Sequence, residues 1–209
     1  MKTFDVVVLG AGSAGEAVAK KLVAAGKSVA LVEKDRGGGE CTFVSCMPSK
    51  AMLRSAQVRT LSKGLPRFGA SSQSPDLGDD LAAFSVAAIR RDEIAAYRDD
   101  KGAAESVEEA AVELFCGEGV ITAANSLRVN DDEITWKDLV ITTSSKADIP
   151  EFSGLSAISY WTSDQALSVS EAPISLAIVG GGPVACELAQ IFSRFSTQTT
   201  IIEFTNQLA

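Results

Sequence analysis

The sequence predicts an α/β protein in which two parallel-sheet units follow one another along the chain. The first observation is a valine-rich run at residues 4–9, which has the continuous apolar character of a parallel strand buried on both faces. The second is the glycine-rich turn after it, which leads into apolar residues at helical spacing and then into another apolar strand, residues 28–32. The third is the return of the same strand–turn–helix–strand order from residue 175 onward.

Composition and charge exclude several classes of function. The 209 residues are enough for one large domain or one and a half ordinary ones. A formal net charge of −8 without a basic cluster argues against a nucleic-acid or anionic-membrane partner. The chain has no long apolar run and no signal-peptide pattern, so we expect a cytoplasmic protein. It also contains no histidine, which excludes Ser-His, Cys-His and His-metal chemistry within these residues.

The first unit carries a dinucleotide-binding fingerprint, G-x-G-x-x-G followed by an acidic residue at the end of the next strand. Gly10 permits the tight turn, and Gly12 lets the backbone approach a pyrophosphate at the helix N-terminus. Gly15 allows close packing of the helix on the strand. Glu33 can bind the adenosine ribose hydroxyls. Because the motif stands between a predicted strand and a predicted helix, a dinucleotide site is favoured over an ordinary glycine turn.

The second unit repeats the first at a constant shift of 170 positions, the difference between residue 180 and residue 10. Gly180, Gly182 and Glu203 occupy the matching positions, and Ala185 stands at the third glycine position, where the pattern tolerates alanine. Ser196 replaces the glycine that ends the first helix, and serine is a poorer terminator. Two units imply two bound dinucleotides, and a glutamate in each favours an unphosphorylated ribose.

A pair of cysteines, Cys41 and Cys46, lies between the two units. Pro48 suits the first turn of a helix, so Cys46 is expected near a helix N-terminus, where the dipole favours a thiolate. An accessible pair of this kind suits redox exchange. Two structural thiols that never pair remain the alternative, because redox pairs usually have two intervening residues. Two dinucleotides and a redox pair together indicate electron transfer through a flavin, with a nicotinamide as hydride donor.

The rest of the chain is predicted from local patterns. Residues 51–63 and 81–111 are expected to be helical, with an exposed Gly/Pro/Ser-rich loop at residues 64–78 between them. Residues 112–143 are expected to form a small antiparallel meander, with Cys116 packed inside it and its last four residues forming one more buried strand. A looser connection with a short helix near residues 163–167 leads to the second unit.

These residues resemble the class I pyridine nucleotide–disulfide oxidoreductases, the flavoprotein family of dihydrolipoamide dehydrogenase, glutathione reductase and mercuric reductase. The resemblance rests on the two glycine motifs and on the segment Gly38-Gly39-Glu40-Cys41-x4-Cys46-Met47-Pro48-Ser49-Lys50. It covers essentially this whole chain but only the N-terminal part of the family. It implies a Rossmann-like FAD-binding domain with a redox-active disulfide at residues 1–150. Residues 151–209 would start an NAD(H)-binding domain.

The resemblance also implies roles for individual residues. Cys46 would be the thiol nearest the flavin, Cys41 would meet the disulfide substrate, and Lys50 would lie near the flavin N5 atom. These three are the predicted catalytic residues. The predicted cofactor contacts are Gly10, Gly12, Ser13, Ala14, Gly15, Glu33, Lys34, Gly39, Glu40, Cys41, Lys50, Thr143 and Ser144 for FAD, and Gly180, Gly182 and Glu203 for NAD(H).

Departures from the family pattern bear on activity. The family's catalytic acid–base is a histidine in a C-terminal interface domain, and neither the histidine nor that domain is present in these residues. The strand beside the flavin normally ends Ala-Thr-Gly-Ser, whereas this chain has Thr142-Thr143-Ser144-Ser145, so Ser144 is expected to crowd the backbone or to adopt a strained φ. We therefore expect a fragment of a longer homodimeric enzyme, with little or no turnover by itself.

Alternatives remain open at this point. A non-catalytic FAD-binding module or sensor is the second hypothesis. A metal site at the two cysteines is weaker, because two thiols without histidine fall short of a usual structural zinc set, and no metal site is predicted. The acceptor could be lipoamide, a glutathione-like disulfide, Hg(II) or a quinone. Glu203 favours NADH over NADPH.

Overall fold

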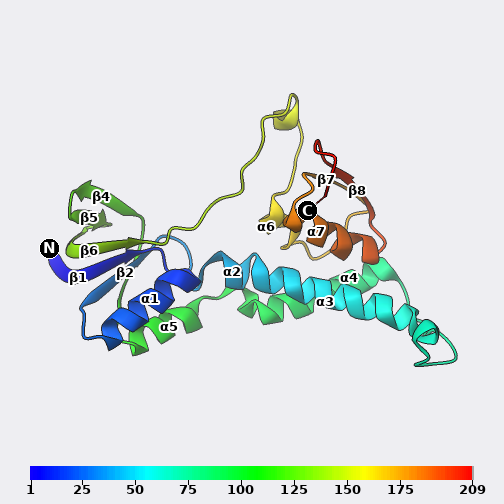
Figure 1. Cartoon of the computed structure of the whole chain (residues 1–209), viewed down its shortest axis with the longest axis horizontal. Helices are drawn as coiled ribbons and strands as arrows, with labels where there is room; N and C mark the ends of the chain where they lie inside the picture. Colours follow the sequence, from blue (N-terminus) through cyan, green and yellow to red (C-terminus); the bar gives the residue numbers. More distant parts are fainter. Residues whose placement is uncertain (209) are drawn as a thin grey trace. The chain divides into compact units, whose positions relative to one another are not determined.

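The computed structural model describes residues 1–208, and these form two compact units, each made from two stretches of the chain (Figure 1). Unit 1 combines Met1–Phe43 with Arg98–Lys146. Unit 2 combines Val44–Tyr97 with the described residues from Ala147 onward. Helices and mostly parallel strands make up both units, which confirms the predicted α/β class.

Within the described residues, unit 1 carries a six-stranded sheet in the order β3-β2-β1-β6-β5-β4. The strands are β1 (Lys2–Leu9), β2 (Val29–Glu33), β3 (Glu113–Cys116), β4 (Gly119–Ala123), β5 (Ser126–Val129) and β6 (Asp132–Ile141). Pairing is parallel between β1 and β2, β1 and β6, and β2 and β3. It is antiparallel from β6 through β5 to β4. The parallel strands therefore place their carboxyl ends along one edge of the sheet.

Successive residues of β1 face two different cores, which explains the unbroken run of valines. Val6 and Val8 pack with residues of helices α1 (Ser13–Ala24) and α5 (Lys101–Glu109). Val7 faces the opposite side, with the meander residues Leu127 and Ile134. Figure 1 shows α1 and α5 side by side, and Lys20 on α1 donates a hydrogen bond to Ser106 on α5 at 2.9 Å. A strand covered on both faces needs apolar residues at every position.

The predicted antiparallel meander over residues 112–143 is only partly right. Strand β3 is a parallel neighbour of β2, so it belongs to the main sheet. Residues 140–143 are not a separate buried strand, because residues 140 and 141 end β6, a ten-residue strand, and Ile141 is 62% exposed. Cys116 is exposed rather than packed. Local patterns show that a segment is extended, but its pairing partner is decided by residues far along the chain.

Unit 2 combines a helical hairpin with the start of a second parallel sheet. Its elements are α3 (Cys46–Lys63), the 3-10 turn η1 (Leu65–Phe68), α4 (Asp80–Ile94), η3 (Leu155–Ala157), α6 (Ser163–Ala166), β7 (Ser175–Val179), α7 (Pro183–Arg194) and β8 (Gln198–Ile202). Strands β7 and β8 pair in parallel. The short helix predicted near residues 163–167 is present as α6.

The helix predicted over residues 81–111 is wrong in one respect, because it is interrupted. α4 ends at Ile94, and α5 begins only at Lys101. Between them lies the turn η2 (Ala96–Arg98), whose three residues all have positive φ, 47°, 53° and 61°. A left-handed run of three non-glycine residues is rare, because each Cβ crowds the following carbonyl. No glycine or proline marks this break in the sequence.

The core of unit 2 joins α7 to the helical hairpin. The Phe84 ring on α4 stacks on Phe192 and meets Phe195 edge-on, both with centroids 5.4 Å apart. At the edge of this core, Asp80 accepts hydrogen bonds from Arg59 at 2.6 Å and from Ser196 at 2.6 Å. These contacts connect α3, α4 and the end of α7.

The predicted boundary after residue 150 divides the chain by the cofactor bound, whereas the two units divide it by packing. Residues 44–97 pack with the C-terminal stretch, and the chain crosses between the units after residues 43, 97 and 146. A division by packing is not a division by cofactor, so the assignment of residues 1–150 to FAD stays a prediction.

Candidate functional site

The first glycine turn is held against the end of β6. Gly10 has φ +105°, and a Cβ there would collide with the carbonyl of Thr142. The Thr142 hydroxyl donates a hydrogen bond to the Gly10 carbonyl at 2.8 Å. A Cβ at Gly15 would in turn collide with that same Gly10 carbonyl. Both glycines are therefore required by close backbone approach, as the fingerprint predicts.

The N-terminus of α1 is open. Gly12, its N-cap residue, is extended, with φ −73° and ψ 179°, and no side chain caps the helix. No heavy atom lies within 4 Å of the position that a Cβ on Gly12 would take. Gly39 approaches from the next motif, since its own Cβ would lie 2.7 Å from the Gly12 Cα. A helix N-terminus without a side-chain cap, with open space beside its N-cap glycine, fits a pyrophosphate.

Glu33 ties the glycine turn to the end of β2. Its Oε2 atom accepts a hydrogen bond from the Ala11 N–H at 2.7 Å, and its Oε1 atom accepts one from the Asp35 N–H at 2.8 Å. Each carboxylate oxygen has further lone pairs. The side chain can therefore hold the turn and still accept hydrogen bonds from ribose hydroxyls.

The second unit repeats this geometry 170 positions later. Glu203 accepts hydrogen bonds from the Gly181 N–H and, at 2.8 Å, from the Thr205 N–H. These hydrogen bonds lower the pKa of Glu203, and the one from the Thr205 N–H has the largest effect. Burial of the carboxyl group raises the pKa, and the hydrogen bond from the Gly181 N–H lowers it further. Gly180 has φ +100°, and Gly182 is the extended, uncapped N-cap of α7. The structure therefore has a second open helix N-terminus.

The two helices of the repeat end differently. Gly26 follows α1 with φ +80°, and Ser196 occupies the matching position after α7 with φ +66°. A left-handed serine carries a steric penalty that glycine avoids. The hydrogen bond from the Ser196 hydroxyl to Asp80 at 2.6 Å compensates part of it.

The predicted redox cysteines lie on two consecutive helices. Cys41 is exposed on α2 (Gly39–Phe43) in unit 1. Cys46 is exposed and is the first residue of α3 in unit 2, which agrees with its expected place at a helix N-terminus. The Ser45 hydroxyl lies 3.7 Å from the Cys46 sulfur. The pairing of the two cysteines stays a prediction.

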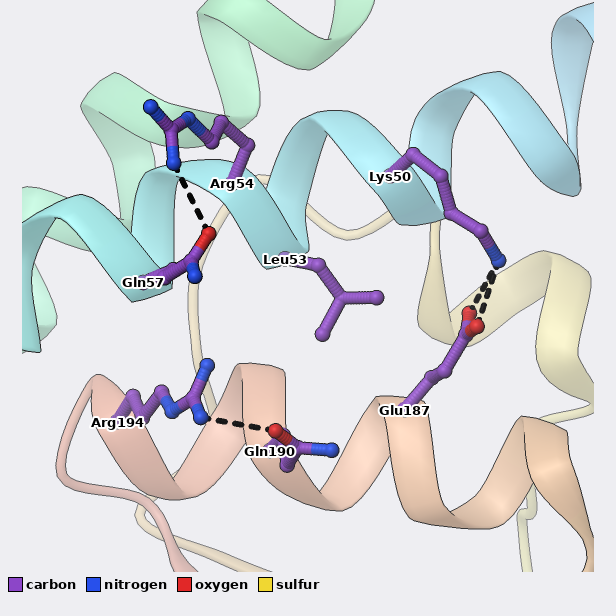
Figure 2. Close-up of a pocket in the computed structure, with 7 residues that line it drawn as sticks. All are labelled: Lys50, Leu53, Arg54, Gln57, Glu187, Gln190 and Arg194. Atoms are coloured by element: carbon purple, nitrogen blue, oxygen red, sulfur yellow. Dashed lines mark hydrogen bonds and ion pairs between the residues drawn. The ribbon is translucent and has the colours of Figure 1, made fainter.

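Lys50 lies one turn into α3 and forms an ion pair that sequence reasoning missed. Its ammonium contacts both carboxylate oxygens of Glu187 on α7, at 2.6 and 2.7 Å (Figure 2). The pair closes one end of an open groove of about 390 Å³ between α3 and α7. The groove is lined by Lys50, Leu53, Arg54, Gln57, Glu187, Gln190 and Arg194. No local signal joins a lysine to a glutamate 137 positions away.

The remaining predicted contacts are exposed side chains or strained backbone. Ser144 has φ +61°, as expected for serine at a position that needs a left-handed residue. The other exposed residues in this set are Ser13, Ala14, Lys34, Glu40 and Thr143. Within unit 1, Ser13 and Ala14 belong to the first turn of α1. Their roles stay predictions.

Comparison with known proteins identifies the family. The family model described as pyridine nucleotide-disulphide oxidoreductase matches residues 4–209. The chain belongs to this family. The resemblance stated from the glycine and cysteine motifs is therefore confirmed.

Curated relatives are oxidoreductases. The chain is 30% identical over 205 residues to mercuric reductase from Staphylococcus aureus, covering 98% of this chain and 37% of the relative. It is 34% identical over 206 residues to dihydrolipoyl dehydrogenase from Acholeplasma laidlawii, covering 97% of this chain and 60% of the relative. The chain thus spans between about a third and three fifths of these relatives.

A solved structure shares the fold. The HOCl-induced flavoprotein disulfide reductase RclA from Escherichia coli aligns with a TM-score of 0.80 and 25% identity, over 98% of this chain and 43% of RclA. The family and its flavoprotein neighbours imply FAD and a pyridine nucleotide as cofactors, as predicted. Among residues 1–208, no helix has both the length and the apolar character needed to cross a bilayer.

Proposed function

We propose that this chain supplies the FAD-binding region and the first part of the NAD(H)-binding region of a flavin-dependent disulfide reductase. One observation carries the proposal: an open glycine turn begins a helix twice, and each time a glutamate at the end of the next strand holds that turn. A flavoenzyme that uses a pyridine nucleotide needs two dinucleotide sites. The segment from Cys41 to Cys46, between the repeats, would supply the redox group.

Unit 1 would hold FAD. Backbone N–H groups at the start of α1 would bind the pyrophosphate, because the space beside Gly12 is open and the helix dipole favours anions. Glu33 would accept hydrogen bonds from the adenosine ribose with the lone pairs that Ala11 and Asp35 leave unused. Further proposed contacts from unit 1 are Gly10, Ser13, Ala14, Gly15, Lys34, Gly39, Glu40, Cys41, Thr143 and Ser144. Lys50, which belongs to unit 2, is the remaining residue predicted to contact FAD.

Unit 2 would hold NADH through Gly180, Gly182 and Glu203. The uncapped N-terminus of α7 supports pyrophosphate binding for the same reason as α1. The hydrogen bonds to Glu203 lower its pKa, so the side chain stays a carboxylate at neutral pH. A carboxylate would repel the 2′-phosphate of NADPH, which supports NADH as the nucleotide.

The chain's own residues would prepare the disulfide. When bound, FAD supplies the two-electron chemistry between a nicotinamide hydride and a disulfide. Cys46 stands at the start of an 18-residue helix, whose dipole stabilises a thiolate. Cys41 is exposed and would meet the acceptor. Lys50, oriented by Glu187, would keep a positive charge beside the flavin.

The whole protein would act on a small disulfide, a dihydrolipoamide-type substrate or Hg(II), as a homodimer. Relatives named mercuric reductase and dihydrolipoyl dehydrogenase support this range. The 209 residues contain no histidine to serve as the family's acid–base group. We therefore propose that they show little steady-state turnover by themselves.

The test is FAD retention followed by NADH reduction. The purified chain is incubated with FAD, passed through a gel-filtration column and then titrated anaerobically with NADH. The wild-type chain should retain a visible flavin band that bleaches with NADH, and Gly12→Glu should lose the band because a carboxylate would fill the pyrophosphate space. Gly102→Glu is the matched control, since Gly102 on α5 also faces open space. Equal FAD retention by wild type and Gly12→Glu, or none by wild type, would contradict the proposal.

A non-catalytic FAD-binding module is the second candidate. The absence of histidine and the left-handed Ser144 beside the proposed flavin site favour it. In that case the flavin band would be retained but would not bleach on addition of NADH.

A further inference from the structure

We propose that Ser45 is a positioning residue that holds Cys46 in its thiolate form. The inference rests on the proposed function, because it adds a residue to the proposed redox pair. In this inference the Ser45 hydroxyl donates a hydrogen bond to the Cys46 sulfur, whereas the hydroxyl of a serine before a helix ordinarily accepts one from a backbone N–H group.

The position of the Ser45 hydroxyl carries the inference. Ser45 is the N-cap of α3, a place where serine is preferred because its hydroxyl usually accepts a hydrogen bond from an N–H group of the first turn. In α3 no such side-chain cap is formed. The hydroxyl instead donates to the Cys46 sulfur at 3.7 Å, a distance suited to an O–H···S contact. The Ser45 carbonyl still accepts the Ser49 N–H at 2.9 Å, so the helix begins normally.

The charged side chains along α3 are compatible with a role of the Ser45 hydroxyl in stabilising the Cys46 thiolate. The first turn of α3 contains no acidic residue that would repel a thiolate. Lys50 lies one turn further on, and its ammonium forms an ion pair with Glu187 from α7 at 2.6 Å. The hydroxyl of Ser49 donates to the Cys46 carbonyl at 3.1 Å and thus contacts backbone rather than sulfur.

A donor to sulfur stabilises the thiolate more than the thiol and therefore lowers the pKa of the thiol. When bound, reduced FAD would supply the two electrons and the one proton that convert a Cys41–Cys46 disulfide into one thiol and one thiolate. One proton goes to the Cys41 sulfur, and the Cys46 sulfur keeps its negative charge. By donating a hydrogen bond to the Cys46 sulfur, the Ser45 hydroxyl would favour the state with the proton on Cys41 and the negative charge on Cys46.

The experiment measures the pH profile of Cys46 alkylation and needs no cofactor. In a Cys41→Ser background, iodoacetamide labelling is followed by mass spectrometry of the tryptic peptide covering residues 37–50, in which Cys46 is then the single cysteine. Ser45→Ala should raise the apparent pKa and slow labelling at pH 7 about three- to tenfold. Ser45→Thr keeps the hydroxyl and should label at the parent rate. Ser49→Ala, the matched control, should also keep the parent profile.

The outcomes separate this inference from the proposed function. A Cys46 pKa well below about 8.5 that is unchanged in Ser45→Ala would overturn the role of Ser45. A parent pKa at about 8.5 would contradict the proposed thiolate as well. Circular dichroism checks that α3 is folded in each variant. If Ser45→Ala does not fold, Ser45→Gly answers the same question, because glycine is accepted at an N-cap and lacks the hydroxyl.

Discussion

Glu33 and Glu203 make the same pair of backbone hydrogen bonds, each joining a glycine turn to the residue two positions beyond the glutamate. The registers of the two strand pairs also agree, since Val6 opposes Val29 and Leu176 opposes Thr199, both shifted by 170. The internal repeat is therefore a repeat of geometry. Each glutamate therefore holds its glycine turn in place and would also accept hydrogen bonds from the ribose of a bound dinucleotide.

Removing the Glu203 carboxylate should weaken NADH binding. Glu203→Ala loses the charged acceptor for the ribose hydroxyls and for the Gly181 N–H, so the Kd for NADH should rise about 10- to 100-fold, as for loss of a hydrogen bond to a charged group. Titration of NADH fluorescence measures the change. Glu171→Ala removes an exposed carboxylate of the same unit and should leave the Kd unchanged. An unaltered Kd in Glu203→Ala would remove this glutamate from the site.

Replacing Ser144 by glycine should stabilise unit 1. Ser144 has φ +61°, and release of a left-handed non-glycine residue is worth about 1 kcal/mol. The thermal unfolding midpoint of Ser144→Gly should rise by a few degrees. Ser145→Gly is the control: Ser145 is not among the residues with positive φ, so extra flexibility in the unfolded chain should lower its midpoint slightly. A fall in the midpoint of Ser144→Gly would show that its hydroxyl matters more than its backbone.

Asp80 should make the stability of unit 2 depend on acid pH. Burial alone would raise the pKa of Asp80, but hydrogen bonds from Lys63, Ser196 and Arg59 outweigh it and hold the pKa below the ordinary value of 3.8. A folded-state pKa below the unfolded value means that the stabilisation is present above pH 3.8 and is lost as the pH falls through the folded value.

The variant Asp80→Asn tests this dependence. It should lower the free energy of unfolding at pH 7 by about 2 kcal/mol, as for hydrogen bonds to a charged group. In urea titrations the difference from wild type should shrink as the pH falls below 3.8. Asp76→Asn is the control, because Asp76 accepts a hydrogen bond from the Gly78 N–H on an exposed loop. A pH-independent difference would mean that packing rather than charge explains the loss.

Adding one methyl group at Gly15 should destabilise unit 1. A Cβ there would collide with the Gly10 carbonyl and lie 2.8 Å from the Thr142 hydroxyl, so Gly15→Ala should cost about 1–3 kcal/mol, as for overpacking. Chemical denaturation measures the loss. Gly102→Ala places the same methyl group in open space on a helix and should be neutral or stabilising. Equal stability of the two variants would contradict the close approach at Gly15.

The glycine turns could be predicted from sequence because their signals are local. Gly10, Gly15 and Glu33 lie within about thirty residues of one another. The burial of strand β1 could likewise be predicted from its consecutive valines. The pairing of β3 with β2 and the contact between Lys50 and Glu187 could not be predicted in this way, because each joins segments far apart in the chain. Periodicity describes a segment, whereas tertiary packing selects its neighbours.

The turn at Ala96–Arg98 also could not be predicted from local periodicity. Helical periodicity runs through residues 81–111 with no glycine or proline at residues 94–100, yet three left-handed residues at 96–98 interrupt it in the folded chain. At about 1 kcal/mol for each such residue, the segment in isolation has no reason to bend there. A synthetic peptide of residues 81–111 should therefore place its helical signal, measured by NMR chemical shifts, straight across residues 96–98. The bend would then belong to the folded protein and not to the peptide.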